Sequence, residues 1–501
     1  MRVLVVGAGM GGLAAAVDLA RQGCAVTVLE AAAAPGGKMR ALVAGGAPVD
    51  AGPTVFTMRW IFEGLFEDAG ARLDDHLDVV ASELLARHAW RQGGRLDLFA
   101  DIGRSAEAIA AFASPEDAQG YRDFCARSAD IHRTLVGPFI ASERPSPLEL
   151  MRRVGDLGAM WRTAPMQRLW GALGRHFRDA RLRQLFARYA TYVGSSPFLA
   201  PATLMLIAHV EQDGVWQVRG GMRAVAAALH RLGLAQGAVF RFGARVAAVL
   251  VEGGRAVGVR LADGEELRAD AVVFNGDVSA LPALGAESAA RPTPRLERSL
   301  SAVVWCVNAP TAGFDLAHHN VFFDEDYAAE FGAIFRRRDI CAAPTVYVCA
   351  QDRGAAATPP APGAPERMLV LVNAPADGDV APLDAGAVAA RGFGLMRACG
   401  LEVSLDAGEA VVTTPAGFHA LFPATGGALY GRANHGMMGS FGRAGAASRL
   451  PGLYLAGGSV HPGPGIPMAA MSGRLAAARL LADRAGRARP VQGLGLTPAG
   501  G

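Results

Sequence analysis

The stretch RVLVVGAGMGGLAAAVDLARQGCAVTVLE, residues 2–30, carries the strongest fold signal in the chain. The apolar run 2–6 predicts a buried strand, the glycines after it predict a tight turn, and residues 13–23 have the spacing of a helix. A second apolar run, 25–30, predicts the next strand. Two strands joined by one helix form a βαβ unit, which indicates the α/β class.

Gly7, Gly9 and Gly12 form a G-x-G-x-x-G pattern between this strand and helix. In that position glycines let the backbone turn sharply and approach a pyrophosphate, while the helix N-terminus faces the anion. Glu30 ends the second strand 18 residues after Gly12, where a carboxylate accepts hydrogen bonds from an adenosine ribose. The pattern predicts a dinucleotide site without separating NAD from FAD. A chance turn is the alternative, since the chain has 63 glycines.

A second glycine turn, PGGKMR at residues 35–40, follows Glu30 closely. Gly36 and Gly37 supply backbone amides, and Lys38 supplies a positive charge, where a second contact with a diphosphate and its ribose is expected. NAD enzymes of the simple doubly wound type lack this element, so the two turns together favour FAD. Lys38 is the only lysine in the chain, and the alternative is a residual lysine on a surface turn.

Composition excludes several classes of protein. A length of 501 residues predicts two or three domains, and 51% hydrophobic with 19% charged residues excludes disorder as the main state. A net charge of +3, without basic runs interleaved with aromatic residues, argues against nucleic acid as a partner. The six cysteines form no CxxC pair, and no signal peptide or membrane-spanning stretch is evident, so we expect a cytoplasmic location.

Helix-like and strand-like stretches alternate along the rest of the chain. Residues 60–200 have mostly helical patterns, 240–277 and about 301–374 are strand-rich, and a final strand and helix precede the end. We therefore predict an FAD-binding domain in three segments, a substrate-binding and membrane-facing domain in two, and a flexible tail. The FAD-binding domain comprises residues 1–70, 215–285 and 445–485. The substrate-binding and membrane-facing domain comprises residues 71–214 and 286–444, and the tail comprises residues 486–501.

Several tracts also resemble one enzyme family. The tracts that carry this similarity are GAGMGGL, PGGKMR, VDAGPTVFTM, VRGGM and LYLAGGSVHPGPGIPMAAMSG. Together they are similar to the carotenoid (phytoene-type) desaturases, a branch of the FAD-dependent amine oxidase superfamily. The resemblance covers nearly the whole chain. It implies an α/β (α+β) fold, with a discontinuous Rossmann-like FAD-binding domain and an inserted substrate-binding domain. DAGPTVFTMRWIFE and FPATGGALYGRANHGMMGSF most resemble the purple-bacterial enzymes that form the C3=C4 bond of acyclic 1-hydroxy or 1-methoxy carotenoids.

The resemblance implies contacts between individual residues and FAD. The ADP half would be held by Gly7, Gly9, Gly12 and Glu30, and Lys38 stands where the superfamily usually has arginine. The backbone of Val246 would contact adenine. Gly458 and Ser459 would lie along the ribityl chain. Ile466, Pro467 and Met468 would start the last helix beside the flavin pyrimidine edge. A helix N-terminus there favours the negative charge that develops on flavin reduction.

The chemistry that the resemblance implies is transfer of an allylic hydride to flavin N5 with loss of a neighbouring proton. The positive charge is delocalised over the polyene, so we expect no strong base, catalytic triad or metal; His318 and His319 are adjacent and cannot share a helix face. His461 and His435 are candidate proton acceptors, and Arg59 and His435 are candidate partners for a polar end group of the substrate. A structural role is the alternative for each.

Two stretches suggest how a carotenoid reaches the flavin. Residues 197–207 are the candidate lining of a polyene channel, with an ordinary core helix as the alternative. In residues 138–170, Met160, Trp161 and Trp170 lie among arginines, so we expect peripheral attachment to the bacterial inner membrane. Oxygen or a quinone is the expected electron acceptor. Phytoene desaturation, another oxidase reaction of the superfamily and non-catalytic isoprenoid binding are the alternative functions.

Overall fold

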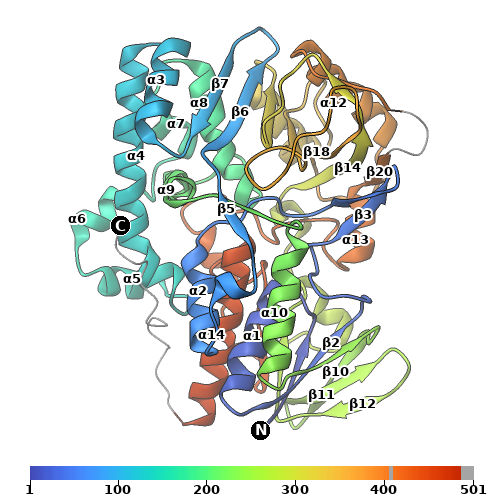
Figure 1. Ribbon diagram of the computed structural model, residues 1–501. Helices are drawn as coiled ribbons and strands as arrows, with labels where there is room; N and C mark the ends of the chain where they lie inside the picture. The colour runs from blue at the N-terminus through green and yellow to red at the C-terminus, as the bar shows by residue number, and fades with distance from the viewer. Residues whose placement is uncertain (406–409, 487–501) are drawn as a thin grey trace.

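Two large sheets organise the protein. The computed structural model describes residues 1–405 and 410–486, with a five-stranded sheet in the lower half of Figure 1 and a seven-stranded sheet in the upper half. The predicted flexible tail lies outside the described residues, apart from Gly486.

The five-stranded sheet is parallel throughout and has the order β21-β13-β1-β2-β9. Its strands are Arg2–Val6 (β1), Ala25–Glu30 (β2), Val239–Phe242 (β9), Ala271–Phe274 (β13) and Leu453–Leu455 (β21). The predicted βαβ unit is confirmed, since helix α1, Met10–Arg21, connects β1 with its neighbour β2. All five strands come from the three segments assigned above to FAD binding, although the exact domain bounds stay a prediction.

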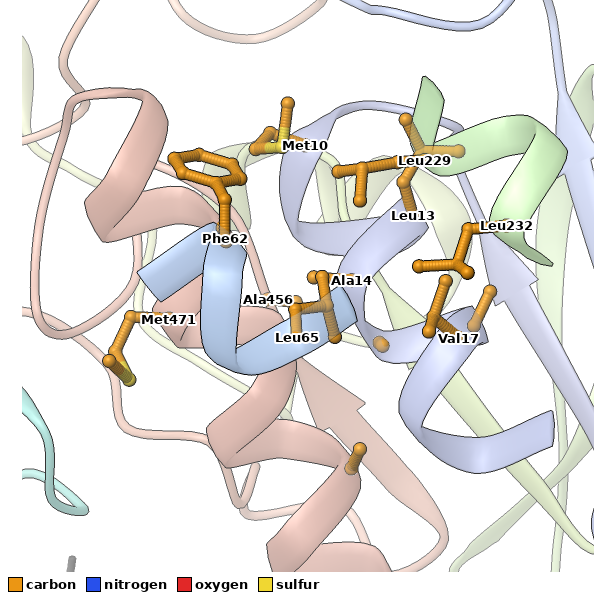
Figure 2. Packing of buried hydrophobic residues seen from close by; sticks show 14 of the residues in the cluster. Met10, Leu13, Ala14, Val17, Phe62, Leu65, Leu229, Leu232, Ala456 and Met471 are labelled. Carbon is orange, nitrogen blue, oxygen red and sulfur yellow. The ribbon is translucent and has the colours of Figure 1, made fainter. Parts of the chain in front are cut away.

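Four helices cover one face of this sheet. They are α1, α2 (Arg59–Asp68), α10 (Arg223–Ala235) and α14 (Ile466–Arg484). Val3 and Val5 of β1 pack against them, while Leu4 points to the opposite face, which is covered by the small sheet β10-β11-β12. Figure 2 shows the helix side of this core, where Leu13 of α1 lies beside Leu229 of α10. The alternation along β1 is what a strand buried on both faces requires.

Helices α1 and α14 approach each other very closely. A Cβ atom on Gly473 would lie 2.0 Å from the carbonyl oxygen of Gly11, and a Cβ on Gly11 would lie 2.9 Å from the carbonyl oxygen of Ala469. Only glycine fits at such a crossing, because any side chain would collide with backbone. The close contact brings the N-termini of both helices to the same end of the sheet.

The seven-stranded sheet has the order β20-β14-β18-β17-β16-β6-β7, and its neighbours are antiparallel except for β16 and β6. The strands are Leu84–Trp90 (β6), Arg95–Phe99 (β7), Ser301–Ala309 (β14), His319–Phe323 (β16), Val346–Ala350 (β17), Glu366–Ala374 (β18) and Ala410–Thr413 (β20). Helix α12, Ala385–Ala398, covers one face, and the other face looks towards a layer of helices.

The prediction of mostly helical structure over 60–200 was wrong for residues 79–99. These contain strand β5, Val79–Ala81, and the hairpin of β6 and β7, whose turn contains Gly93 and Gly94. The Gly-Gly turn between two alternating stretches is a hairpin signal that the prediction missed. Only the second partner of β6, β16, lies more than 200 residues away and is invisible to a local pattern.

The helical prediction holds for the remainder of that block. Its helices and short helical turns are Ile102–Phe112 (α3), Pro115–Leu135 (α4), Val136–Ile140 (η2), Pro147–Val154 (α5), Leu157–Arg162 (α6), Leu169–Leu173 (α7), Ala180–Ala187 (α8) and Arg188–Val193 (η3). Just beyond the block follow Ala202–Met205 (η4) and Leu206–Asp213 (α9). Local signals fix several ends: Ser146 and Glu149 form a capping box at α5, and Ser114 caps α4 ahead of Pro115. Within the described part of the chain, no helix is long and apolar enough to span a bilayer.

The remaining strands form smaller sheets and link the two halves. They are Ala41–Ala44 (β3), Ala47–Asp50 (β4), Trp216–Val218 (β8), Val246–Glu252 (β10), Arg255–Leu261 (β11), Glu266–Arg268 (β12), Thr311–Ala312 (β15) and Glu402–Val403 (β19). Hairpin β3–β4 packs its Val49 against Cys306 and Leu369 of the seven-stranded sheet. The chain between Glu30 and α2 therefore crosses from one sheet to the other, at the place where both border one cavity.

Candidate functional site

One cavity of about 960 Å³ runs from the carboxyl ends of the parallel strands to the space between the seven-stranded sheet and the helical layer. The carboxyl end of a parallel sheet is where such folds bind ligands. At this end the cavity is lined by glycine turns; further in, it is lined by apolar side chains such as Leu204, Ile207, Leu369 and Leu371. The cavity thus joins a polar nucleotide-type end to an apolar end.

The first glycine turn has no room for side chains. Gly7 has a φ of 98°, and a Cβ on Gly12 would lie 2.0 Å from the carbonyl oxygen of Gly7. A Cβ on Gly9, the N-cap of α1, would lie 2.9 Å from Nδ2 of Asn275. No side chain caps α1, so its first N–H groups are left for a ligand. This geometry fits a diphosphate.

Glu30 lies at the rim of the same turn. Its carboxylate accepts hydrogen bonds from the backbone N–H of Ala8 at 2.7 Å and of Ala32 at 2.8 Å, and it lines the cavity. Each oxygen keeps a free lone pair for a ribose hydroxyl. Val246, the first residue of β10, lines the cavity at this end as well.

The second glycine turn packs directly on the first. The N–H of Gly36 donates to the carbonyl of Ala8 at 2.9 Å, and a Cβ on Gly37, whose φ is 58°, would lie 3.2 Å from Cα of Gly9. The structure therefore brings together the two turns that the sequence separates by more than twenty residues.

Lys38 points inward from this turn and not to the surface. Its Nζ donates to the carbonyl of Leu429 and lies 5.3 Å from the centre of the Phe422 ring. Burial lowers the pKa of Lys38, while the nearby Asp277 carboxylate acts in the opposite direction. The lysine thus places a cation beside the part of the cavity wall that Phe422 and Leu429 form.

The C-terminal wall is the start of α14 and the loop before it. Gly458, Ser459, Ile466, Pro467 and Met468 all line the cavity. Gly465 is the N-cap and has no capping side chain. Pro467 has no N–H, so the amides available at this end are those of Ile466 and Met468 rather than of all three residues. These predicted residues share one cavity with the others predicted for FAD, namely Gly7, Gly9, Glu30, Gly36, Gly37, Lys38 and Val246. Gly12 packs beneath the cavity. Their individual contacts with FAD stay predictions.

Three further residues support this site and were not predicted. Asn275 and Asp277 follow strand β13 and line the cavity, and Asn275 donates to the carbonyl of Gly7 at 3.2 Å. Their position after a strand of the parallel sheet was a usable signal. Arg443 is 2% exposed and donates to the carbonyls of Tyr430 and Gly458; burial lowers its pKa to about 10. No local pattern marks this arginine.

His461 lies behind the cavity wall. Its Nε2 contacts the carbonyl oxygens of Phe139 at 2.9 Å and of Ser142 at 3.0 Å, and its side chain is 2% exposed. Burial lowers the pKa of His461 to about 4. The ring therefore ties the loop before α14 to η2, which is the structural alternative considered above.

His435 and Arg59 also lie away from the cavity. His435 accepts a hydrogen bond from the backbone of Ser196 at 3.0 Å and borders a separate cavity of about 180 Å³. Arg59 forms ion pairs with Glu63 at 2.8 Å and with Asp74 at 2.5 Å, on α2 and the turn after it. Neither residue lines the cavity of about 960 Å³, and each is engaged by its own neighbours; their roles towards a substrate stay predictions.

The predicted polyene-lining stretch borders the apolar half of the cavity. From residues 197–207, the lining residues are Pro201, Thr203, Leu204, Leu206 and Ile207. The opposite wall is the seven-stranded sheet, which contributes Val304, Leu369 and Leu371.

His318, His319 and Cys349 form a buried cluster whose possible ligand atoms lie within 4.8 Å of one another. The two histidines are adjacent, as noted, but they start a strand and not a helix, and Cys349 lies across from His319 on β17. Existing contacts account for the cluster: His318 Nδ1 lies 2.9 Å from the Arg353 carbonyl, and His319 Nδ1 lies 2.7 Å from the Tyr347 hydroxyl.

Comparison with known proteins agrees with this geometry. Residues 10–481 match the family described as flavin containing amine oxidoreductase. The hydroxyneurosporene desaturase of Rubrivivax gelatinosus is 56% identical over 98% of this chain and 95% of that protein, and the hydroxyneurosporene desaturase of Cereibacter sphaeroides is 46% identical over 97% and 99%. An oxidoreductase from Methanosarcina mazei has the same fold, with a TM-score of 0.61 at 17% identity over 95% of this chain and 99% of that one. The chain thus belongs to the flavin containing amine oxidoreductases, in their branch of FAD-dependent carotenoid desaturases.

Proposed function

We propose that the protein introduces the C3=C4 double bond into acyclic 1-hydroxy or 1-methoxy carotenoids, such as 1-hydroxyneurosporene, which would give demethylspheroidene. The observation that carries the proposal is the continuous cavity, which joins an FAD-type glycine cradle to an apolar space between Ile207 and Leu371. Such a space next to a flavin suits a long apolar substrate. The names of the two hydroxyneurosporene desaturases to which the chain is similar support the substrate class that we propose.

FAD supplies a hydride acceptor when it is bound. The chain contributes the walls that hold the polyene and exclude water from it, namely η4 and α9 on one side and β14 and β18 on the other. The uncapped N-terminus of α14 adds a fixed positive dipole at the cavity wall. Because a polyene delocalises positive charge, the reaction places no demand on His461 or His435 as bases. For re-oxidation we propose oxygen or a quinone as electron acceptor.

Product analysis tests the substrate class. We expect the purified holoenzyme to convert 1-hydroxyneurosporene in liposomes at least about tenfold faster than phytoene, because a placed polar group discriminates an oxygen-bearing substrate from a hydrocarbon. Chromatography resolves the products and locates the new double bond. Equal turnover of phytoene would show instead a phytoene desaturase, and the absence of turnover with FAD bound would remove the desaturase proposal.

We also propose that the protein docks on a membrane surface through α5 and α6. Exposed apolar side chains gather there: Leu148, Met151, Leu157, Trp161 and Met166, of which Trp161 is 75% exposed. Leu150, Met160, Thr163 and Pro165 from the same segment line the cavity, so the apolar patch lies beside a route into it. Trp170, expected in this patch, packs instead against Phe198, with ring centres 4.8 Å apart.

Liposome flotation tests this surface. We expect the double change Leu157→Glu and Trp161→Glu to lower the fraction of bound protein at least about tenfold, since each side chain loses roughly 1.5–3 kcal/mol of burial in the bilayer. Val43→Glu is the matched control, because Val43 is 67% exposed on β3, which Figure 1 places on the opposite side of the molecule from α6. Flotation of the double variant equal to that of the control would place the membrane contact elsewhere.

A further inference from the structure

A polar network interrupts the apolar half of the cavity. Arg188 and Tyr192 on η3, Glu211 on α9 and the adjacent Tyr189 all line it. The guanidinium of Arg188 donates to the hydroxyl of Tyr192 at 3.1 Å, and that hydroxyl donates to Glu211 at 2.8 Å. Tyr189 donates to the other oxygen of Glu211 at 2.8 Å. Polar groups in such a place are costly unless they bind something.

Arg188 holds most of the unused hydrogen-bonding capacity of this network. A guanidinium has five N–H donors, and among the described residues Arg188 spends one, on Tyr192. It takes part in no ion pair of the described chain, and its remaining contacts are with the rings of Tyr192 and Tyr347, whose centres lie 5.1 Å and 5.5 Å away. Arg188 is itself a lining residue of the cavity, which leaves its other N–H groups for a ligand there.

Glu211, in contrast, offers acceptors and not donors when it is ionised. Both of its oxygens already accept a phenol hydrogen, and burial raises the pKa of its carboxyl group, against the effect of the two tyrosines and of Arg188. The carboxylate balances the charge of Arg188 through the hydroxyl of Tyr192. A charge-balanced group with free donors suits an uncharged oxygen acceptor better than an anion.

The network also lies beside the wall that is expected to follow the flavin. Gly194, directly after η3, packs on Tyr430: a Cβ there would lie 2.6 Å from Cδ2 of the Tyr430 ring. The carbonyl of Tyr430 accepts a hydrogen bond from Arg443, which also donates to the carbonyl of Gly458, a residue expected along the ribityl chain. In a C3–C4 desaturation the oxygen-bearing carbon, C1, is only two bonds from C3. A group that binds this oxygen must therefore lie close to the flavin, and the contacts through Tyr430 put the network beside that wall.

We propose that Arg188 binds the oxygen on C1 of the carotenoid, with Tyr192 and Glu211 orienting its guanidinium and balancing its charge. This inference rests on the proposed function and assigns its selectivity to named residues. A donor suits both substrate types, because a hydroxyl and a methoxy oxygen both accept hydrogen bonds. A hydrocarbon end group leaves the donors of Arg188 buried and unpaired, which disfavours its binding.

Substrate competition tests the assignment. In Arg188→Met, we expect the ratio of kcat/KM for 1-hydroxyneurosporene to that for neurosporene to fall about 10- to 100-fold, as expected when a charged hydrogen bond is removed. Tyr192→Phe keeps the guanidinium but breaks its link to Glu211, and we expect a smaller fall in the same ratio. FAD absorbance of each purified variant reports whether the fold and cofactor site are intact.

A buried group outside the cavity provides a control. Arg338→Met removes a mostly buried guanidinium that pairs with Asp377, and neither residue lines the cavity. This variant is expected to lose stability without a change in the substrate ratio. If Arg188→Met and Tyr192→Phe bind FAD and keep the parent ratio, Arg188 does not recognise the oxygen. If Arg188→Met does not fold, the ratio in Tyr192→Phe decides. A parent enzyme without preference for 1-hydroxyneurosporene would overturn the proposed function instead.

Discussion

Gly12→Ala is expected to yield a protein that binds FAD at least about 100-fold more weakly, equivalent to about 2.7 kcal/mol. The added Cβ would lie 2.0 Å from the carbonyl oxygen of Gly7, so the turn between β1 and α1 has to open. That movement displaces the start of α1 and the second glycine turn, which rests on Gly9. Fluorescence titration of the apoprotein with FAD measures the affinity.

Gly394→Ala is the matched control. Gly394 lies within α12, and a Cβ there has no heavy atom within 4 Å. The same substitution should leave FAD affinity unchanged and raise stability by about 0.5–1 kcal/mol, because alanine restricts the unfolded chain and favours helix. Unchanged FAD binding in both variants would mean that the cofactor does not use the first glycine turn.

Arg474→Met is expected to lower the free energy of unfolding by about 3–5 kcal/mol. Arg474, on α14, is 2% exposed and pairs with Asp18 of α1 at 3.0 Å and with Asp68 of α2. Removing the guanidinium leaves the Asp18 carboxylate, which is 5% exposed, with Arg21 as its remaining cationic partner. Urea denaturation followed by circular dichroism, at saturating FAD, measures the loss.

Arg241→Ala tests whether any lost ion pair has this effect. Arg241 and Glu265 form a bidentate pair on the surface, where both side chains are more than a third exposed. Exposed pairs contribute roughly 0–1 kcal/mol, so a small change is expected. If Arg474→Met and Arg241→Ala lower the free energy of unfolding by equally small amounts, the contact between α1, α2 and α14 does not depend on the buried charges.

The cofactor half of the site could be predicted from sequence. The βαβ unit, both glycine turns and Glu30 depend on interactions between near neighbours: alternation within a strand, positive φ in a turn, and the N-terminus of the helix that follows. The final strand and helix gave the same kind of signal. Asn275 and Asp277 were within reach of this reasoning, since they follow a strand of the same sheet.

The substrate half was decided by the tertiary structure. Arg59, His435 and His461 were reasonable choices by residue type, yet none of them lines the cavity, whereas Arg188 and Glu211, which no motif marks, do. The place of the β6–β7 hairpin in the seven-stranded sheet likewise depends on the distant strand β16. Local patterns determine which elements form and which turns bind a phosphate, because neighbouring residues set backbone conformation. Which side chains meet inside a cavity depends on packing between segments hundreds of residues apart, and only the folded chain specifies it.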